Sequence, residues 1–369
     1  MIKVLHISVS SDIGGGPEHI YQLISSLPPC IESHVACPDN GPYFGKFSHL
    51  TSGRVTLLGY RRLEVKFLVS LQRYVKKHNI QLLHAHGKGA GIYARLLRVF
   101  LGCTVVLTPH GINQDVERGL LKKGYLFFER AFGWLIDRII YVSDSEYQYA
   151  KKIGIWGNLP FRIIYNGTKL ISQSQKERLK SELNLKPGLH NRKVVISASR
   201  FDYQKNTLQF CEIALKLPEF VFILLGNGQE KEKCIEFCQA NNVKNVFFIG
   251  AVDNPMSYFA CADIYLSTSR WEGLSMAILE AMSLGLPTVA TNVVGNIDLV
   301  KQRETGFLYD IGNIEEAVEC LRTVLGDKYN FFSSNALASH REMFSSIVMG
   351  NATADMYMEC LQNESSEKQ

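Results

Sequence analysis

The sequence has no uninterrupted apolar run of the roughly 18 residues that a membrane-spanning helix requires. It opens with MIKVLHISVS, a buried-strand pattern, and shows no basic region, apolar core and cleavage site in the order of a secretory signal. Nine cysteines cannot all pair with one another, and no second Cys or His pair follows Cys234 and Cys238. These absences predict a cytoplasmic protein with reduced structural thiols and no zinc site.

Nucleic-acid-binding motifs are absent as well, although part of the chain is basic. Residues 1–170 carry 21 Lys and Arg against 11 Asp and Glu, whereas residues 171–369 carry 19 against 24. The first half therefore favours an anionic surface or acceptor, and nucleic acid is not a predicted partner. At 369 residues the chain exceeds the roughly 250–300 residues of a single core, so two domains are expected.

Short apolar runs separated by helix-length segments predict an α/β protein with two doubly wound parallel sheets. The predicted strands of the first domain are 3–9, 34–37, 54–58, 81–84, 105–108, 138–142 and 162–165. Those of the second domain are 194–197, 220–225, 246–249, 264–267, 288–291 and 306–309. The expected domains are 1–170 and 193–345, joined by a polar linker at 171–192. Residues 346–369 are expected to form a helix that crosses back to the first domain, with a disordered tail beyond about Gln362.

The stretch 267–286, STSRWEGLSMAILEAMSLGL, follows a predicted strand and leads into a helix. Glu272 and Gly273 lie on the loop, and Glu280 lies inside the helix. The backbone N–H groups free at the start of this helix belong to Leu274, Ser275 and Met276. They predict an anion site, and the two glutamates, one on the loop and one on the helix, are placed to grip different parts of one extended ligand.

Two further loops follow predicted strands. SRFDYQKN places Arg200 and Lys205 beside a helix N-terminus, an arrangement of cations that suits a diphosphate. SDIGGGPEH carries three consecutive glycines at Gly14, Gly15 and Gly16, which let a phosphate or a sugar approach the backbone. No third glycine stands where a dinucleotide-binding fingerprint requires it, so a nicotinamide or flavin cofactor is not predicted.

The pattern EGLSM…EAMSLGLP resembles the signature of glycosyltransferase family 4, a large family of retaining enzymes. The resemblance implies the GT-B fold, in which two Rossmann-like domains face each other across a cleft. It implies that Glu272 meets the transferred sugar and Glu280 the nucleotide ribose. Arg200 and Lys205 match the family's diphosphate-binding Arg and Lys.

The same resemblance assigns residues of the first half. His110 in TPHG matches a family histidine that contacts the donor sugar near the reacting carbon, and Gly15 and Gly16 match a loop opposite the donor diphosphate. His84 and His86 in LLHAHG resemble a common strand end of the family, so His86 and the Gly14 loop are weak candidates for acceptor binding. His6, inside the first predicted strand, is expected to be a core residue.

Weaker similarities support the assignment. Asn166-Gly167 resembles an Asn-Gly at the family's domain junction, and Val294–Asp298 resembles a G-G-x-x-E stretch. Val294 replaces the first glycine of that stretch and Asp298 its glutamate, so no specific contact is carried over to Asp298. Trp271 is expected to be a packing or cleft-shaping aromatic and not a catalytic group.

No Asp-x-Asp triplet occurs, although a divalent metal holding the donor diphosphate would call for one. We therefore expect metal-independent chemistry without a cofactor. The resemblance implies transfer of a hexose or N-acetylhexosamine, most often from a UDP-sugar and otherwise from GDP-mannose. The expected acceptor is a glycan or an undecaprenyl-diphosphate-linked sugar of O-antigen, capsule or exopolysaccharide synthesis.

Two basic, aromatic-rich stretches, 119–136 and 61–77, raise the question of a membrane surface. They are compatible with peripheral binding to anionic lipid on the inner face of the plasma membrane, and equally with amphipathic helices that pack on the sheet. Alternatives to a transferase also stay open. They are a GT-B sugar-nucleotide epimerase or phosphorylase, and a non-catalytic nucleotide- or carbohydrate-binding module.

Overall fold

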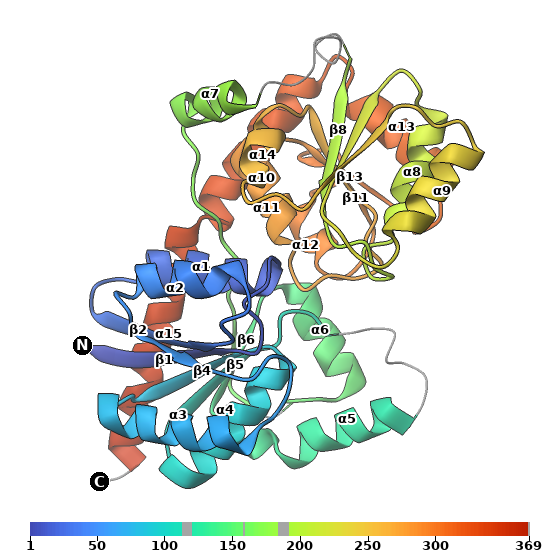
Figure 1. The fold of residues 1–369 in the computed structure, drawn as a ribbon. Coiled ribbons are helices and arrows are strands. Elements are labelled where there is room, and N and C mark those ends of the chain that lie inside the picture. Colours follow the sequence, from blue (N-terminus) through green and yellow to red (C-terminus); the bar gives the residue numbers. More distant parts are fainter. Residues whose placement is uncertain (113–119, 158, 184–191, 368–369) are drawn as a thin grey trace. The chain divides into compact units, whose positions relative to one another are not determined.

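The computed structural model describes residues 1–112, 120–157, 159–183 and 192–367. The chain divides into two compact units (Figure 1). The first unit comprises Met1–Gly167 together with Ser346–Gln369, and the second comprises Thr168–Ser345. The second unit is thus inserted in the chain between two parts of the first.

The sheet of the first unit has seven parallel strands in the order β3-β2-β1-β4-β5-β6-β7. Its strands are β1 (Ile2–Ser8), β2 (Ile31–Cys37), β3 (Val55–Leu57), β4 (Leu82–His86), β5 (Thr104–Thr108), β6 (Arg138–Tyr141) and β7 (Phe161–Ile163). Each overlaps a run that the sequence predicts to be a strand. The strand order reverses between β1 and β4, where open α/β sheets bind their ligands.

Helices cover both faces of this sheet (Figure 1). They are α1 (Gly15–Ser26), α2 (Pro42–Leu50), α3 (Val65–His78), α4 (Lys88–Leu101), α5 (Leu120–Ala131), η2 (Gly133–Leu135), α6 (Asp144–Ile153) and α15 (Ser346–Glu367). Apolar residues of α3 and α4 share one core cluster with the sheet, and those of α1 and α15 share another. Strands β4 and β5 are buried along their whole length because neither face of the sheet meets water there.

Helix α15 returns to the first unit and packs tightly there. A side chain at Gly350 would place its Cβ 2.4 Å from the carbonyl oxygen of Ser26 on α1, so only glycine allows this approach. Met356 and Tyr357 are fully buried in the core that α15 shares with β1 and β4. The helix extends to Glu367, beyond Gln362, where the sequence predicts that order ends.

The sheet of the second unit has six parallel strands in the order β10-β9-β8-β11-β12-β13. They are β8 (Val194–Ala198), β9 (Val221–Leu225), β10 (Val246–Gly250), β11 (Ile264–Ser267), β12 (Thr288–Thr291) and β13 (Gly306–Tyr309). The helices are α7 (Gln173–Glu182), α8 (Thr207–Lys216), α9 (Lys231–Ala240), α10 (Pro255–Ala260), α11 (Met276–Ser283), α12 (Asn296–Leu299), α13 (Ile314–Val324) and α14 (Tyr329–Met343). Here the strand order reverses between β8 and β11.

The stretch 171–192, which composition predicts to be a linker, contains α7. A capping box between Ser172 and Gln175 starts this helix. Lys176 then donates to the carbonyl oxygen of Leu284 at 2.5 Å, which ties α7 to the second unit. The helix is polar because it lies on the surface, which explains why its composition resembles that of a linker.

All nine cysteines are free thiols, in agreement with the sequence analysis. Among the helices that the structure describes, none combines the length and the apolar character needed to cross a bilayer.

Candidate active site

In the second unit, two motif-bearing loops flank the point where the strand order reverses. SRFDYQKN follows β8, and SRWEGLS follows the neighbouring strand β11. Thr268 donates to the carbonyl oxygen of Lys205 at 2.9 Å, and Arg270 N–H donates to the carbonyl oxygen of Gln204 at 2.7 Å. Backbone and side-chain bonds therefore hold the two loops together at the carboxyl edge of the sheet.

Glu272 and Lys205 form an ion pair between these loops. The ammonium of Lys205 lies 2.5 Å from Oε1 of Glu272, and the hydroxyl of Ser269 donates to the same oxygen at 2.6 Å. The side chains of Lys205 and Glu272 are 18% and 8% exposed, so water screens the pair little. The two residues that the sequence assigns to a diphosphate and to a sugar thus touch each other.

Arg200 has a different environment. Its guanidinium is half exposed and lies 3.1 Å from Oδ2 of Asp202 and 3.2 Å from Oε1 of Gln204. Asp202 also accepts from the backbone N–H of Lys205 at 3.0 Å, which shapes the loop. The sequence analysis did not single out Asp202, although an Asp three residues before a lysine in a strand-to-helix loop is a recognisable turn signal.

Helix α11 begins beside this ion pair. Ser275 is its N-cap and accepts from the N–H of Ile278 at 3.5 Å, while Leu274 and Ser275 are buried. Glu280 lies within α11 and is partly buried. Both glutamates of the motif are therefore placed on one loop-helix element, Glu272 before the helix and Glu280 inside it.

Gly295 packs on the loop that carries Glu272. Its φ is +86°, and an added Cβ would lie 2.7 Å from the carbonyl oxygen of Gly273 and 2.8 Å from Cβ of Glu272. The N–H of Glu272 donates to the carbonyl oxygen of Val294 at 3.0 Å. The Val294–Asp298 stretch thus supports the backbone of Glu272, so substitution of its first glycine by Val294 leaves the supporting glycine in place.

The loop Gly226–Gly228 after β9 was missed by the sequence analysis. A Cβ at Gly226, where φ is +122°, would lie 1.9 Å from the carbonyl oxygen of Ser199, and a Cβ at Gly228 would lie 2.4 Å from that of Phe201. The N–H of Phe201 donates to the carbonyl oxygen of Asn227 at 3.0 Å. This loop therefore supports the backbone on both sides of Arg200, and a Gly-x-Gly directly after a buried strand was the available signal.

In the first unit, the glycine-rich loop follows β1 and α1 begins at Gly15. A Cβ at Gly14 or Gly16 would meet no atom within 4 Å. Packing within the unit therefore does not require glycine at these two positions, in contrast to Gly41, whose Cβ would lie 2.2 Å from the carbonyl oxygen of Ser11. Open space over Gly14 and Gly16 is what close approach of a ligand would need.

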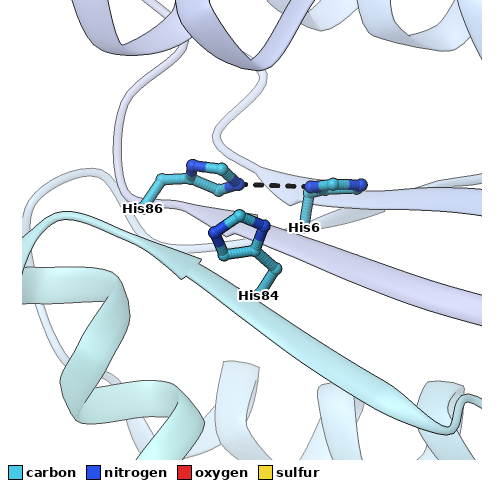
Figure 2. A group of neighbouring side chains, drawn as sticks. All are labelled: His6, His84 and His86. Atoms are coloured by element: carbon cyan, nitrogen blue, oxygen red, sulfur yellow. Dashed lines mark hydrogen bonds between the residues drawn. The ribbon is translucent and has the colours of Figure 1, made fainter. Parts of the chain in front are cut away.

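Five histidines gather near the carboxyl edge of the first sheet, and we call them the histidine cluster. They are His6, His19, His84, His86 and His110. Parallel pairing sets His6 beside His84, and His86 beside Thr108, two residues before His110. Figure 2 shows His6, His84 and His86, with the bond between His6 and His86.

Hydrogen bonds link most of these rings. Nδ1 of His6 lies 3.2 Å from Nε2 of His86, whose Nδ1 lies 3.1 Å from Nε2 of His110. Nitrogens of His84 bond the hydroxyls of Tyr357 at 2.5 Å and Thr108 at 2.7 Å. His84 and His6 are fully buried, so both are core residues, as the sequence predicts for His6.

Burial keeps the histidine cluster uncharged. Desolvation lowers the pKa of His6 to about 3 and that of His19 to about 4. It also lowers the pKa of His84, His86 and His110 well below 6.5. Each ring is therefore neutral at pH 7, with one N–H and one lone pair.

The cluster invites comparison with a metal site. The nitrogen separations of 3.1 and 3.2 Å are close to the distance of about 3.3 Å between two imidazole nitrogens that bind the same tetrahedral zinc ion. However, His86 belongs to both candidate triads, His6–His84–His86 and His19–His86–His110, and both of its nitrogens are already bonded to other rings. Both nitrogens of His84 are already bonded to hydroxyl groups, those of Tyr357 and Thr108. The hydrogen bonds between rings are enough to explain the short nitrogen separations. We assign no metal to the cluster.

The backbone at His110 is held in an uncommon conformation. His110 has a φ of +57°, and Gly111 follows with a φ of +99°. Glu146, fully buried on α6, accepts from the N–H of Gly111 at 2.6 Å and from that of Val142 at 3.0 Å. The sequence analysis missed Glu146, although Ser143 and Glu146 have the S-x-x-E spacing of a capping box.

Comparison with known proteins identifies the family. Residues 13–170 match the family described as Glycosyltransferase Family 4, and residues 180–341 match the one described as Glycosyl transferases group 1. The chain belongs to glycosyltransferase family 4. It is therefore an enzyme of a family of retaining hexosyltransferases.

Relatives of this glycosyltransferase match most of its length. It is 26% identical to UDP-Gal:alpha-D-GlcNAc-diphosphoundecaprenol alpha-1,3-galactosyltransferase of Escherichia coli over 98% of both chains. It is 25% identical to the O-antigen biosynthesis glycosyltransferase WbnH of Escherichia coli over 77% of this chain and 80% of the relative.

Solved structures confirm the expected GT-B fold. Anabaena Alr3699/HepE in complex with UDP and glucose has a TM-score of 0.83 at 19% identity, covering 97% of this chain and 100% of that one. The sucrose-phosphate synthase of Thermosynechococcus elongatus has a TM-score of 0.83 at 18% identity, with 98% and 100% coverage. At these identities the similarity shows the fold alone.

Proposed function

We propose that this glycosyltransferase moves a hexose or N-acetylhexosamine from a UDP-sugar to a lipid-linked sugar during synthesis of a bacterial surface polysaccharide. The end-to-end match to the Escherichia coli galactosyltransferase carries the proposal, since the name of that relative states a UDP-sugar donor and a diphosphoundecaprenol-linked acceptor. Relatives named for O-antigen biosynthesis support the same setting.

The second unit supplies the groups that a sugar nucleotide needs. Arg200 and Lys205 offer positive charge to the diphosphate, and the dipole at the N-terminus of α11 adds a third source. Lys205 has three N–H donors, so it can hold Glu272 and still meet a phosphate oxygen. As the diphosphate leaves, these fixed donors stabilise its growing charge without a divalent metal.

The two motif glutamates take different parts of the donor in this proposal. Oε1 of Glu272 is occupied by Lys205 and Ser269, which orients the carboxylate and turns Oε2 to a hydroxyl of the transferred sugar. Glu280 accepts from the ribose hydroxyls. His110 of the first unit contacts the sugar near the reacting carbon, and Gly15 and Gly16 lie along the diphosphate.

A thermal-shift panel of nucleotide sugars with EDTA present tests the donor site. We expect one UDP-sugar to raise the melting temperature of the wild type, and Glu280→Ala to weaken this shift. Glu236→Ala, on the exposed face of α9, is the matched control and should respond like the wild type. No shift with any nucleotide sugar, with or without added Mg²⁺, would overturn the proposal.

Product analysis then separates transfer from the alternative reactions. A retained anomer linked to an undecaprenyl-diphosphate sugar supports the proposal. A changed sugar on intact nucleotide without acceptor would indicate an epimerase instead, and turnover that needs inorganic phosphate would indicate a phosphorylase.

A further inference from the structure

Three imidazoles of the histidine cluster form a continuous hydrogen-bonded chain. His6 on β1 bonds His86 at the end of β4, and His86 bonds His110 after β5, with nitrogen separations of 3.2 and 3.1 Å. Figure 2 shows the first of these links. Residues from three adjacent segments of the sheet are thereby connected, and the chain ends on the histidine assigned to the sugar.

Neutral rings make the two links interdependent. A neutral imidazole has one N–H and one lone pair, and each N···N bond consumes one of each. His86 uses both nitrogens, so the position of its proton decides the direction of both bonds. Only two arrangements of the whole chain satisfy both links: every ring protonated on Nδ1, or every ring protonated on Nε2.

The buried end of the chain distinguishes these arrangements. Within the described residues, Nε2 of His6 has no hydrogen-bond partner, and the ring is fully buried. If the rings were protonated on Nε2, His6 would bury an N–H without an acceptor. Buried N–H groups without a partner are rarer than underused acceptors. If the rings are protonated on Nδ1, Nε2 of His6 carries only an unused lone pair, which costs less free energy.

We propose that His86, anchored by His6, is a positioning residue that holds His110 as its Nδ1–H tautomer, a hydrogen-bond donor. His6 then donates to His86, and His86 donates to Nε2 of His110. His110 makes no Nδ1 bond within the part of the chain described, so its Nδ1–H is available to a ligand oxygen. The hydrogen bond that the N–H of Gly111 donates to Glu146 holds the backbone that presents the ring.

This assignment rests on the proposed function for its ligand, an oxygen of the sugar nucleotide. A donor at Nδ1 stabilises negative charge on that oxygen, whereas it cannot remove a proton from an acceptor hydroxyl. The inference therefore makes His110 an electrophilic group and excludes it as the general base.

Nitrogen-15 NMR of the full chain with labelled histidine tests the tautomers directly. We expect a pyrrole-type shift for Nδ1 and a pyridine-type shift for Nε2 in all three rings, with scalar couplings across both N–H···N bonds. Pyrrole-type Nε2 in His86 and His110, or the absence of both couplings, would overturn the proposal. This readout needs no substrate, so it stands apart from any failure of the proposed function.

Kinetics of His86 variants provide the second test. His86→Leu removes the donor to His110, and we expect kcat to fall about tenfold, while KM for the sugar nucleotide stays within about twofold. His86→Gln, whose amide can donate to Nε2 of His110 and accept from His6, should restore most of kcat. His49→Leu, at an exposed histidine outside the cluster, is the control. Equal loss of kcat in both His86 variants, with wild-type melting temperatures, would count against the positioning role.

Discussion

A single carboxylate oxygen, Oε1 of Glu272, organises the candidate donor site at the residue scale. It receives the ammonium of Lys205 and the hydroxyl of Ser269 in a place where both charged side chains are mostly buried. A buried charge whose partner is removed stays desolvated without compensation. The pair therefore links the stability of the second unit to the proposed donor site.

Removal of either partner should reveal this coupling. We expect Glu272→Gln and Lys205→Met each to lower the free energy of unfolding by about 2 kcal/mol, because each leaves its partner uncompensated. The double variant should lose at least about 1 kcal/mol less than the sum of the two. Urea unfolding of the four proteins measures the cycle, and strictly additive losses would show that the pair does not stabilise the fold.

Glycine at position 226 offers a second test at this scale. Gly226→Ala places a Cβ 1.9 Å from the carbonyl oxygen of Ser199 and forces the loop that carries Arg200 to move. We expect a loss of about 2 kcal/mol or more in unfolding free energy and a weaker affinity for UDP, measured by calorimetry. Gly250→Ala has the same sign of φ, at +95°, but open space around the Cβ, so it should cost only about 1 kcal/mol.

At the scale of elements, the strands were predictable and several supporting contacts were not. Runs such as Val194–Ala198 and Ile264–Ser267 are mainly apolar because both faces of their sheet are covered, so their hydrophobicity identifies them as strands. The motif loops follow from the rule that parallel sheets bind ligands at their carboxyl edge.

The rest depends on contacts between residues far apart in the sequence. Composition predicted a linker at 171–192, yet Lys176 holds α7 through a carbonyl 108 positions away. The chain from His6 to His86 needs the register of β1 against β4, which no local pattern reveals. Glu146 bonds Gly111, the residue after His110, across 35 positions for the same reason.

Helix α5 and the turn after it expose the aromatic and basic residues on which the membrane hypothesis rests. Phe127 and Trp134 are 70% and 68% exposed, and Lys123 on the same helix is exposed. Basic side chains beside exposed aromatics are typical of surfaces that bind anionic lipid. This observation keeps peripheral membrane binding as a proposal, beside the alternative of an amphipathic helix packed on the sheet.

Vesicle flotation decides between these two interpretations. We expect the wild type to float with phosphatidylglycerol vesicles and less with phosphatidylcholine vesicles. The double variant Phe127→Ser/Trp134→Ser should bind about tenfold more weakly, because two aromatic rings no longer leave water. Phe331→Ser, at a 51% exposed aromatic of the second unit, is the matched control and should not change binding. Equal flotation with both lipids would contradict the hypothesis.

At the scale of the whole molecule, the two units differ in how many histidines they bury. In the first unit, burial lowers the pKa of His34 and of all five histidines of the cluster, whereas in the described part of the second unit it lowers only that of His340, to about 4. An unfolded imidazole takes up a proton near pH 6.5, well before these folded ones. Acid should therefore destabilise the first unit more.

The direction follows from proton uptake. Because the unfolded chain binds more protons between about pH 6.5 and 4, the free energy of unfolding falls as pH falls through that range. Each buried histidine that stays neutral in the folded chain lowers the free energy of unfolding by up to roughly 1.4 kcal/mol for each pH unit that the pH falls. Hydrogen exchange of the full chain at about pH 7.5 and 5.5, corrected for intrinsic rates, should show a greater loss of protection in β4 and β5 than in β11 and β12. Equal losses in both sheets would contradict this expectation.

The return of α15 to the first unit has a consequence for biosynthesis. Tyr357 closes the core around His84, so the amino-terminal sheet lacks part of its interior until residues 346–367 have been translated. The inserted unit has all of its own strands by then and can fold first on the ribosome. The polypeptide is thus expected to complete its second unit before the core of its first unit is closed, although most of the first unit is made earlier.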